Sequence, residues 1–201
     1  MLHAVLTGDI VNFTKLRPEE EKQLFKALEK ILKSYSFEFY RGDSFQVFIK
    51  EPQFALKIAL LCRSAAITIS QSCDIRISIG IGTVIAPVKK LGAAKGEAFL
   101  LSGRAFDKMQ KAGARLVIAS GNEMINEGLT VLANYIDSIY NNLTSKQATV
   151  INGLLKGETQ QKMTDELNKS KSTIHQLTIS GRWAEIERLL LQFETLINYL
   201  L

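Results

Sequence analysis

The feature that most constrains the fold is a strict alternation of isoleucine with polar or small residues. Ile75, Ile77, Ile79 and Ile81 alternate with Arg76, Ser78, Gly80 and Gly82. Side chains of a β-strand point alternately to two faces, so this period of two predicts a strand with one apolar face. The two glycines lie on the other face and let a helix or a ligand approach the backbone closely. Tight helix packing is the simpler interpretation.

The segments around this strand alternate between helix and strand patterns. Pro18 precedes three glutamates, which favours a helix start because proline suits the first turn and acids suit the positive end of the helix dipole. The predicted elements, in chain order, are a helix over 18–34, an antiparallel hairpin of strands over 37–40 and 44–49, helices over 52–70 and 97–111, and a strand over 115–119. This alternation indicates an α/β domain that ends near Ser120.

Two Gly-Asp pairs follow apolar, strand-like runs. Gly8-Asp9 and Gly42-Asp43 are each expected to form a turn that projects a carboxylate from a strand end, and Asp43 should lie at the tip of the hairpin. Two carboxylates suit a divalent cation such as Mg²⁺ when phosphate oxygens and water complete its shell. Asp9 and Asp43 are therefore candidate metal ligands at one shared site. The alternative is that each aspartate only completes a turn.

Length, composition and charge narrow the function classes. The chain has 201 residues, of which 46% are hydrophobic, enough for a sizeable core in one or two domains. A formal net charge of +5 is compatible with a polyanionic partner. Residues 144–201 hold seven Lys or Arg and six Asp or Glu, so most of the basic excess lies elsewhere.

Cysteine usage and the N-terminal residues predict a cytoplasmic protein. Cys62 and Cys73 have no metal-ligand spacing and are interpreted as reduced thiols. Asp9 and Asn12 interrupt the first apolar run, which argues against a signal peptide. No run approaches the roughly twenty apolar residues of a membrane span, so no membrane partner is expected.

The β patterns fade after residue 121. Apolar residues at steps of three and four predict a helical linking segment over 121–143. Thr144 then caps a helix that runs to 156, a second helix covers 158–167, and a turn over 168–170 leads into a third helix. Apolar residues of these three helices can close one small core: Val150, Ile151, Leu154, Leu155, Met163, Leu167, Ile174 and Leu177.

This segment resembles the helix-turn-helix of many bacterial DNA-binding domains, with Thr164 where alanine is usual. The resemblance implies that the first turns of the third helix contact base edges and that nearby cations contact phosphates. Gln176 could read adenine and Lys171 guanine. The candidate DNA-binding residues are Lys169, Lys171, Ser172, Thr173, His175, Gln176 and Arg182, of which Lys169 and Arg182 are assigned to the backbone. The low net charge of this segment leaves a protein-binding module as the alternative.

The last helix carries a long apolar stripe that must be buried. Its members follow a spacing of three and four: Trp183, Ile186, Leu190, Phe193, Ile197 and Leu200, widened by Leu189 and Leu196. The stripe could pack against the first domain or form a homodimer. A two-fold dimer would present two third helices to a palindromic site.

Three stretches together resemble a known type of domain. The stretches "LTGDIVNFT", "FEFYRGDSFQVF" and "IRISIGIGTV" resemble the palm domain of class III nucleotide cyclases and GGDEF proteins. With the terminal helix-turn-helix, the chain is similar to the SatD family of bacterial proteins. The resemblance implies an α+β, ferredoxin-like palm over 1–120, the link over 121–143, and an all-α helix-turn-helix domain over 144–201 that ends in a long helix.

The resemblance also assigns roles by position. Asp9 and Asp43 match the two metal-binding carboxylates, Ile10 can add a backbone carbonyl, and Arg104 falls near the arginine that stabilises departing pyrophosphate. The asparagine expected four residues before Arg104 is Leu100. The purine-reading lysine expected three residues before Gly42 is Phe39, which cannot donate a hydrogen bond to a base.

These two departures make cyclase activity unexpected. The leading hypothesis is a bacterial, cytoplasmic DNA-binding transcriptional regulator whose palm-like domain scaffolds or senses a ligand. The alternative is a metal-dependent nucleotide-binding protein or degenerate cyclase that uses Asp9 and Asp43. Its nucleotide-binding groups would be Arg41, Lys89, Lys90 and Arg104.

Overall fold

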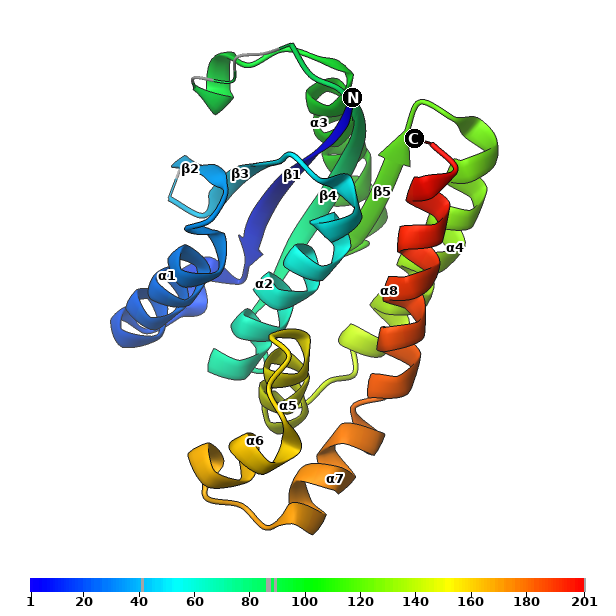
Figure 1. The fold of residues 1–201 in the computed structure, drawn as a ribbon. Helices are drawn as coiled ribbons and strands as arrows, with labels where there is room; N and C mark the ends of the chain where they lie inside the picture. The colour runs from blue at the N-terminus through cyan, green and yellow to red at the C-terminus, as the bar shows by residue number, and fades with distance from the viewer. Residues whose placement is uncertain (41, 86–87, 89, 201) are drawn as a thin grey trace.

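The computed structural model describes residues 1–40, 42–85, 88 and 90–200, and its centre is a mixed five-stranded sheet (Figure 1). The strands are β1 (Leu2–Val11), β2 (Ser36–Tyr40), β3 (Ser44–Ile49), β4 (Asp74–Thr83) and β5 (Leu116–Ser120). Their order across the sheet is β2-β3-β1-β4-β5. The first four strands pair antiparallel, and β5 pairs parallel with β4.

The connections between the first four strands follow the split βαβ pattern. Helix α1 (Pro18–Leu32) joins β1 to β2, and helix α2 (Ala55–Ile69) joins β3 to β4, so the two crossovers interleave. This order of strands and helices is that of the ferredoxin-like βαββαβ unit. Short 3₁₀ turns accompany it as η1 (Phe13–Lys15), η2 (Pro52–Phe54) and η3 (Leu91–Ala93).

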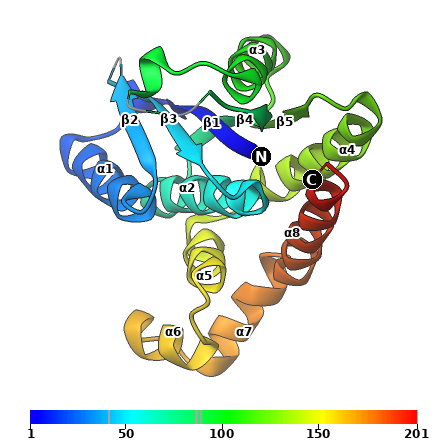
Figure 2. The same cartoon turned by 45° about the horizontal axis from the view of Figure 1, so that its top comes forward.

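Helices cover both faces of the sheet. Helix α3 (Glu97–Ala112) lies on one face, while α1 and α2 lie on the other (Figure 2). Helices α4 (Glu123–Tyr140) and α8 (Trp183–Asn198) lie side by side next to α2, and α4 packs on β5. Helices α5 (Ser145–Leu155), α6 (Gln160–Leu167) and α7 (Lys171–Ser180) follow beyond α2.

The two faces of β4 behave as the alternation predicts. Its four isoleucines are at most 1% exposed and join the main core with α2. A Cβ atom added to Gly80 would lie 2.2 Å from the carbonyl oxygen of Ala98 and 2.4 Å from the backbone nitrogen of Ser102. Helix α3 therefore packs directly on the glycine face, which confirms the prediction of tight helix packing.

The first Gly-Asp pair does not form the predicted turn. Gly8 and Asp9 lie within β1, where Asp9 pairs with Ser44 on one side and with Arg76 on the other. Glycine is needed at position 8 because a Cβ atom there would lie 2.7 Å from the ring of Phe45. The second pair does lie at the tip of the β2–β3 hairpin, where Gly42 has a positive φ of 82°.

The main hydrophobic core crosses the predicted boundaries at 120 and 143. Buried residues of α4, such as Ile136, and of α5, such as Ile151, belong to the same cluster as the sheet. Polar bonds also hold α5 against α2, where the amide nitrogen of Asn152 donates to the Leu61 carbonyl and to the Ser64 hydroxyl, at 3.1 and 2.8 Å. Helices α4 and α5 are thus part of the same packed unit as the sheet.

The apolar stripe of α8 is buried within the chain itself. Ile186, Phe193 and Ile197 are fully buried, and α8 contacts α4, α2 and η2. Of the two ways to bury this stripe, packing on the rest of the chain is the one that occurs here.

Residues 52–69, which contain η2 and α2, are apolar and long enough to cross a membrane by length and composition. In the fold, 67% of this window is buried, because α2 packs against the sheet, α1 and α5.

Candidate functional site

Local signals in the sequence define the two short helices α6 and α7. The Thr159 hydroxyl accepts a hydrogen bond from the backbone nitrogen of Lys162, and the Ser170 hydroxyl accepts one from that of Thr173. Each bond satisfies an amide that the first turn of a helix leaves unpaired. Asn168 ends α6 in the left-handed region, with φ 49° and ψ 52°, so the chain turns sharply into α7.

A small core fixes α7 against α5 and α6. Val150, Met163 and Ile174 are buried together, and Leu154, Leu167 and Leu177 pack against them. These six residues were predicted to form one core with Ile151 and Leu155. Those two instead join the main core, because α5 also packs against α2 with its other side.

The outer face of α7 exposes the predicted contact residues. Lys171, Ser172, Thr173, His175 and Gln176 are all exposed, whereas Ile174 and Thr178 on the inner face are buried. The hydroxyls of Ser172 and Thr173 hydrogen-bond to that of Ser170. In the part of the chain that the structure describes, the side chains of Lys171, His175 and Gln176 have no hydrogen bond or ion pair.

A shallow depression lies where α6 and α7 begin. Gln160 and Gln161 line it from α6, and Lys171, Ser172 and His175 line it from α7. The free backbone amides of both helix starts are therefore close to exposed polar side chains. Such a surface suits an anionic group because helix starts carry partial positive charge.

The two remaining DNA-binding candidates differ from each other. Lys169 is exposed in the turn next to α7. Arg182 lies between α7 and α8, and its guanidinium binds the Glu185 carboxylate through two bonds of 2.8 and 2.6 Å. It also donates to the Tyr135 hydroxyl at 2.8 Å and stacks over that ring. Arg182 thus links α8 to α4 and is less available than Lys169.

The metal candidate Asp9 already has a cationic partner. Its carboxylate accepts two hydrogen bonds from Arg76, at 2.8 and 2.6 Å, and only 9% of its side chain is exposed. Asp43 is near because the Ile10 amide donates to its carbonyl, and the Ser44 hydroxyl donates to its carboxylate at 3.2 Å. Among the described residues no group of three or more His, Cys, Asp or Glu could hold a metal ion. Arg76 thus already neutralises one of the two carboxylates that were predicted to bind Mg²⁺, and the metal site stays a prediction.

The nucleotide-binding candidates are not brought together around Asp9. Arg41 and Lys89 lie outside the described residues. Lys90 is exposed just before η3, which packs on β2 and β3. Arg104 follows the buried Ser102 of α3 by two residues, about 200° around the helix, so it is exposed on the side away from the sheet.

Sequence reasoning missed a buried charge cluster around Arg63. This residue of α2 is fully buried, and its guanidinium binds Asp74 of β4 and Asp137 of α4. Asp137 also accepts hydrogen bonds from the backbone nitrogens of Arg115 and Leu116. An arginine among the mostly apolar residues of α2 was a visible signal, but its partners lie 11 and 74 residues away in sequence.

Comparisons with known proteins add only a weak structural likeness. No protein-family model and no curated protein sequence matches the chain. Two solved structures of bacterial light-regulated adenylyl cyclases are similar to 59% of it, with 15% identity and a TM-score of 0.41 in one case and 17% and 0.37 in the other. The match covers 43% and 42% of those chains, so this chain corresponds to less than half of either cyclase. Likenesses of this size do not assign an activity.

Proposed function

We propose that the protein is a DNA-binding transcriptional regulator that contacts double-stranded DNA through α7. In this proposal α6 and α7 act as a helix-turn-helix, and the α/β part scaffolds them or senses a ligand. The observation that carries the proposal is the outer face of α7, where Lys171, His175 and Gln176 are exposed and have no partner among the described residues, while Ile174 fixes the inner face.

The spacing of these side chains suits a groove of DNA. Lys171 and His175 are four residues apart, as are Ser172 and Gln176, so the four form two adjacent rows on one face of the helix. A major groove about 12 Å wide admits an α-helix, and glutamine and lysine are donors that read base edges there. Figure 1 supports the access that this requires, since α6 and α7 lie at the end of the molecule farthest from η3 and the N-terminus.

The charge around α7 predicts modest affinity and a shallow salt dependence. Lys162 forms salt bridges with Glu158 and Glu166, at 3.3 and 3.6 Å, so its charge is largely neutralised and adds little attraction for DNA phosphates. The cations that remain near the turn are Lys169 and Lys171. Few phosphate contacts mean that affinity falls gently with salt, by a slope of about 0.9 per phosphate neutralised.

The test is binding of the purified chain to a fragment pool from its own genome at low salt, followed by fluorescence anisotropy on retained fragments. Lys171→Ala and Gln176→Ala should each weaken selective binding by about 1 to 3 kcal/mol, which is about 5- to 150-fold. The matched control is Lys108→Ala, which removes the same charge from the exposed side of α3, across the sheet from α7 (Figure 2). It should bind as the wild type does.

Two results would reject the proposal. One is no retained fragment at low salt, and the other is binding that Lys108→Ala and Lys171→Ala weaken equally, which would indicate general charge attraction. Repeating the measurement with Mg²⁺ and nucleoside triphosphates tests for ligand sensing. A change in DNA affinity would support a sensing role for the α/β part, and an unchanged affinity would support a scaffold.

A further inference from the structure

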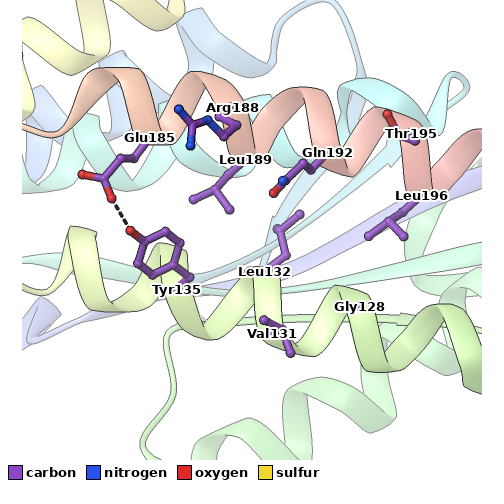
Figure 3. A pocket seen from close by; sticks show the side chains of 10 residues that line it. All are labelled: Gly128, Val131, Leu132, Tyr135, Glu185, Arg188, Leu189, Gln192, Thr195 and Leu196. Atoms are coloured by element: carbon purple, nitrogen blue, oxygen red, sulfur yellow. Dashed lines mark hydrogen bonds between the residues drawn. The ribbon is translucent and has the colours of Figure 1, made fainter.

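An apolar groove runs along the outer side of α4 and α8. Its floor is formed by Leu132 of α4 and by Leu189 and Leu196 of α8, and its volume is about 780 Å³ (Figure 3). The groove is separate from the α7 surface and from Asp9 and Asp43, none of which line it. Neither the core packing nor the proposed DNA contact explains why these side chains form an open channel.

The α4 rim of this groove has the pattern of a helix that faces another helix. Met124, Gly128, Val131 and Tyr135 follow each other at steps of four, three and four residues. Met124 is 83% exposed, Val131 70% and Tyr135 42%, although all three are large apolar or aromatic residues. A repeat of about 3.5 residues is the seam spacing of packed helices.

The two helices run antiparallel, which places charges at known levels along the groove. Tyr135 donates a hydrogen bond to Glu185 at one end, and Gly128 lies against Leu196 farther along. Arg188, one turn after Glu185, therefore lines the half of the groove formed by the C-terminal half of α4. It helps to lower the pKa of Glu185 to about 2, after the hydrogen bonds from Arg182 and Tyr135, but forms no salt bridge within the described residues.

The opposite half of α4 carries acidic groups on its exposed side. Glu123 and Glu127 are exposed and form no salt bridge in the described ranges of the chain. Of the charged residues that line the channel, Glu185 is neutralised by Arg182, which leaves the charge of Arg188 beside the C-terminal half of α4. Glu127, one turn before Val131, flanks the channel beside the N-terminal half. This arrangement is self-complementary, because a second copy turned by 180° presents its acidic half to the basic half of the first.

We propose that this groove is a homodimer interface in which the α4 helices of two copies pack antiparallel around a two-fold axis near Val131. Val131 lies at the middle of the 18-residue α4, so the α4 helices of the two copies then overlap along their full length. Residues four positions to either side of the axis face each other, which places Glu127 of one copy beside Tyr135 and Arg188 of the other. Every contact occurs twice, as in any isologous interface. The proposal does not depend on DNA binding.

The first test is the mass of the purified chain by light scattering across a dilution series without DNA. The wild type should pass from twice the 22.4 kDa chain mass toward 22.4 kDa on dilution. Glu127→Arg and Arg188→Glu should each raise the dimer Kd by about ten-fold or more, because each creates like charges at two symmetric places. The double variant, which exchanges the two charges, should return to within about three-fold of the wild type.

The second test locates the axis. Val131→Cys should form an intermolecular disulfide on mild oxidation, since the two Cα atoms at the axis would lie within the roughly 7 Å that a disulfide allows. Thr130→Cys is the matched control, because it is exposed one residue away but about 100° around the helix. A wild type that is monomeric at all concentrations overturns the proposal. A dimer insensitive to both charge reversals, or one crosslinked equally by the two cysteines, also overturns it.

Discussion

Replacing Arg63 by methionine should destabilise the fold more than any surface change. The guanidinium is fully buried, with bonds of 3.1 and 2.7 Å to Asp74, a bond of 2.5 Å to Asp137, and the ring of Tyr140 at 4.9 Å. Methionine is similar in length and apolar, so the cavity left behind is small. The main effect is that two buried or partly buried carboxylates lose their cation.

The size of this effect follows from the charges. Removing one partner of a buried ion pair costs about 3 to 5 kcal/mol, a large part of the roughly 5 to 15 kcal/mol that holds a typical domain folded. With a urea slope of about 2 kcal/mol per molar, the unfolding midpoint should fall by about 1.5 to 2.5 M. Because Arg63 joins α2, β4 and α4, the loss should affect the whole core and not one helix end.

A double-mutant cycle with Asp137→Asn tests the electrostatic cause. In the wild type, Asp137→Asn removes a partner of Arg63 and should destabilise. In the Arg63→Met background it removes an unpaired buried charge, while its amide oxygen can still accept from the nitrogens of Arg115 and Leu116. The same substitution should therefore cost clearly less there, with a coupling of about 1 to 3 kcal/mol.

The measurement is equilibrium urea unfolding followed by circular dichroism for all four proteins. Arg104→Met, on the exposed side of α3, is the control and should shift the midpoint by no more than about 0.3 M. A shift of Arg63→Met as small as that of the control would refute the reasoning. Equal costs of Asp137→Asn in the two backgrounds would refute its electrostatic part.

Two further predictions concern the packing of the sheet and its buried thiols. Gly80→Ala should lower the free energy of unfolding by about 2 kcal/mol or more, since its Cβ meets the α3 backbone, and urea unfolding would contradict this by showing an unchanged midpoint. Burial raises the pKa of Cys62 and of Cys73 to about 12, so the unfolded chain, with thiols near about 8.5, loses these protons first. Stability should therefore fall as pH rises from about 9 toward 12, and Cys62→Ala should make that fall shallower in urea midpoints measured from pH 8 to 11.

The elements that could be predicted are those whose signals are local. The proline and acids in the first turn of α1, the isoleucine alternation of β4, and the hydroxyl caps of α5 and α7 each act within a few residues of the structure they determine. The exposed face of α7 could be predicted for the same reason, because helical spacing separates its inner apolar residues from its outer polar ones. Its role in DNA binding stays a prediction.

The surroundings of the predicted carboxylate pair could not be read in this way. The sequence marked Asp9 as unusual, but the residue that binds it, Arg76, is 67 positions away. Their contact exists because β1 and β4 pair antiparallel in one register, which brings both side chains to the same face of the sheet. A shift of one residue in that register would send every side chain of β1 to the other face.

The sequence by itself determined which segments become helix or strand and which rows of apolar side chains must be buried. Both properties depend on periodicity and on capping residues within one segment. Only the tertiary structure decided what each stripe meets. The stripe of α8 was apolar enough to form a dimer interface or to join the core. It is buried against α4, α2 and η2, because the short turn after α7 directs α8 back alongside α4. The same packing leaves Met124, Val131 and Tyr135 exposed on α4, since a helix that contacts β5 and α8 with two sides keeps its third side open.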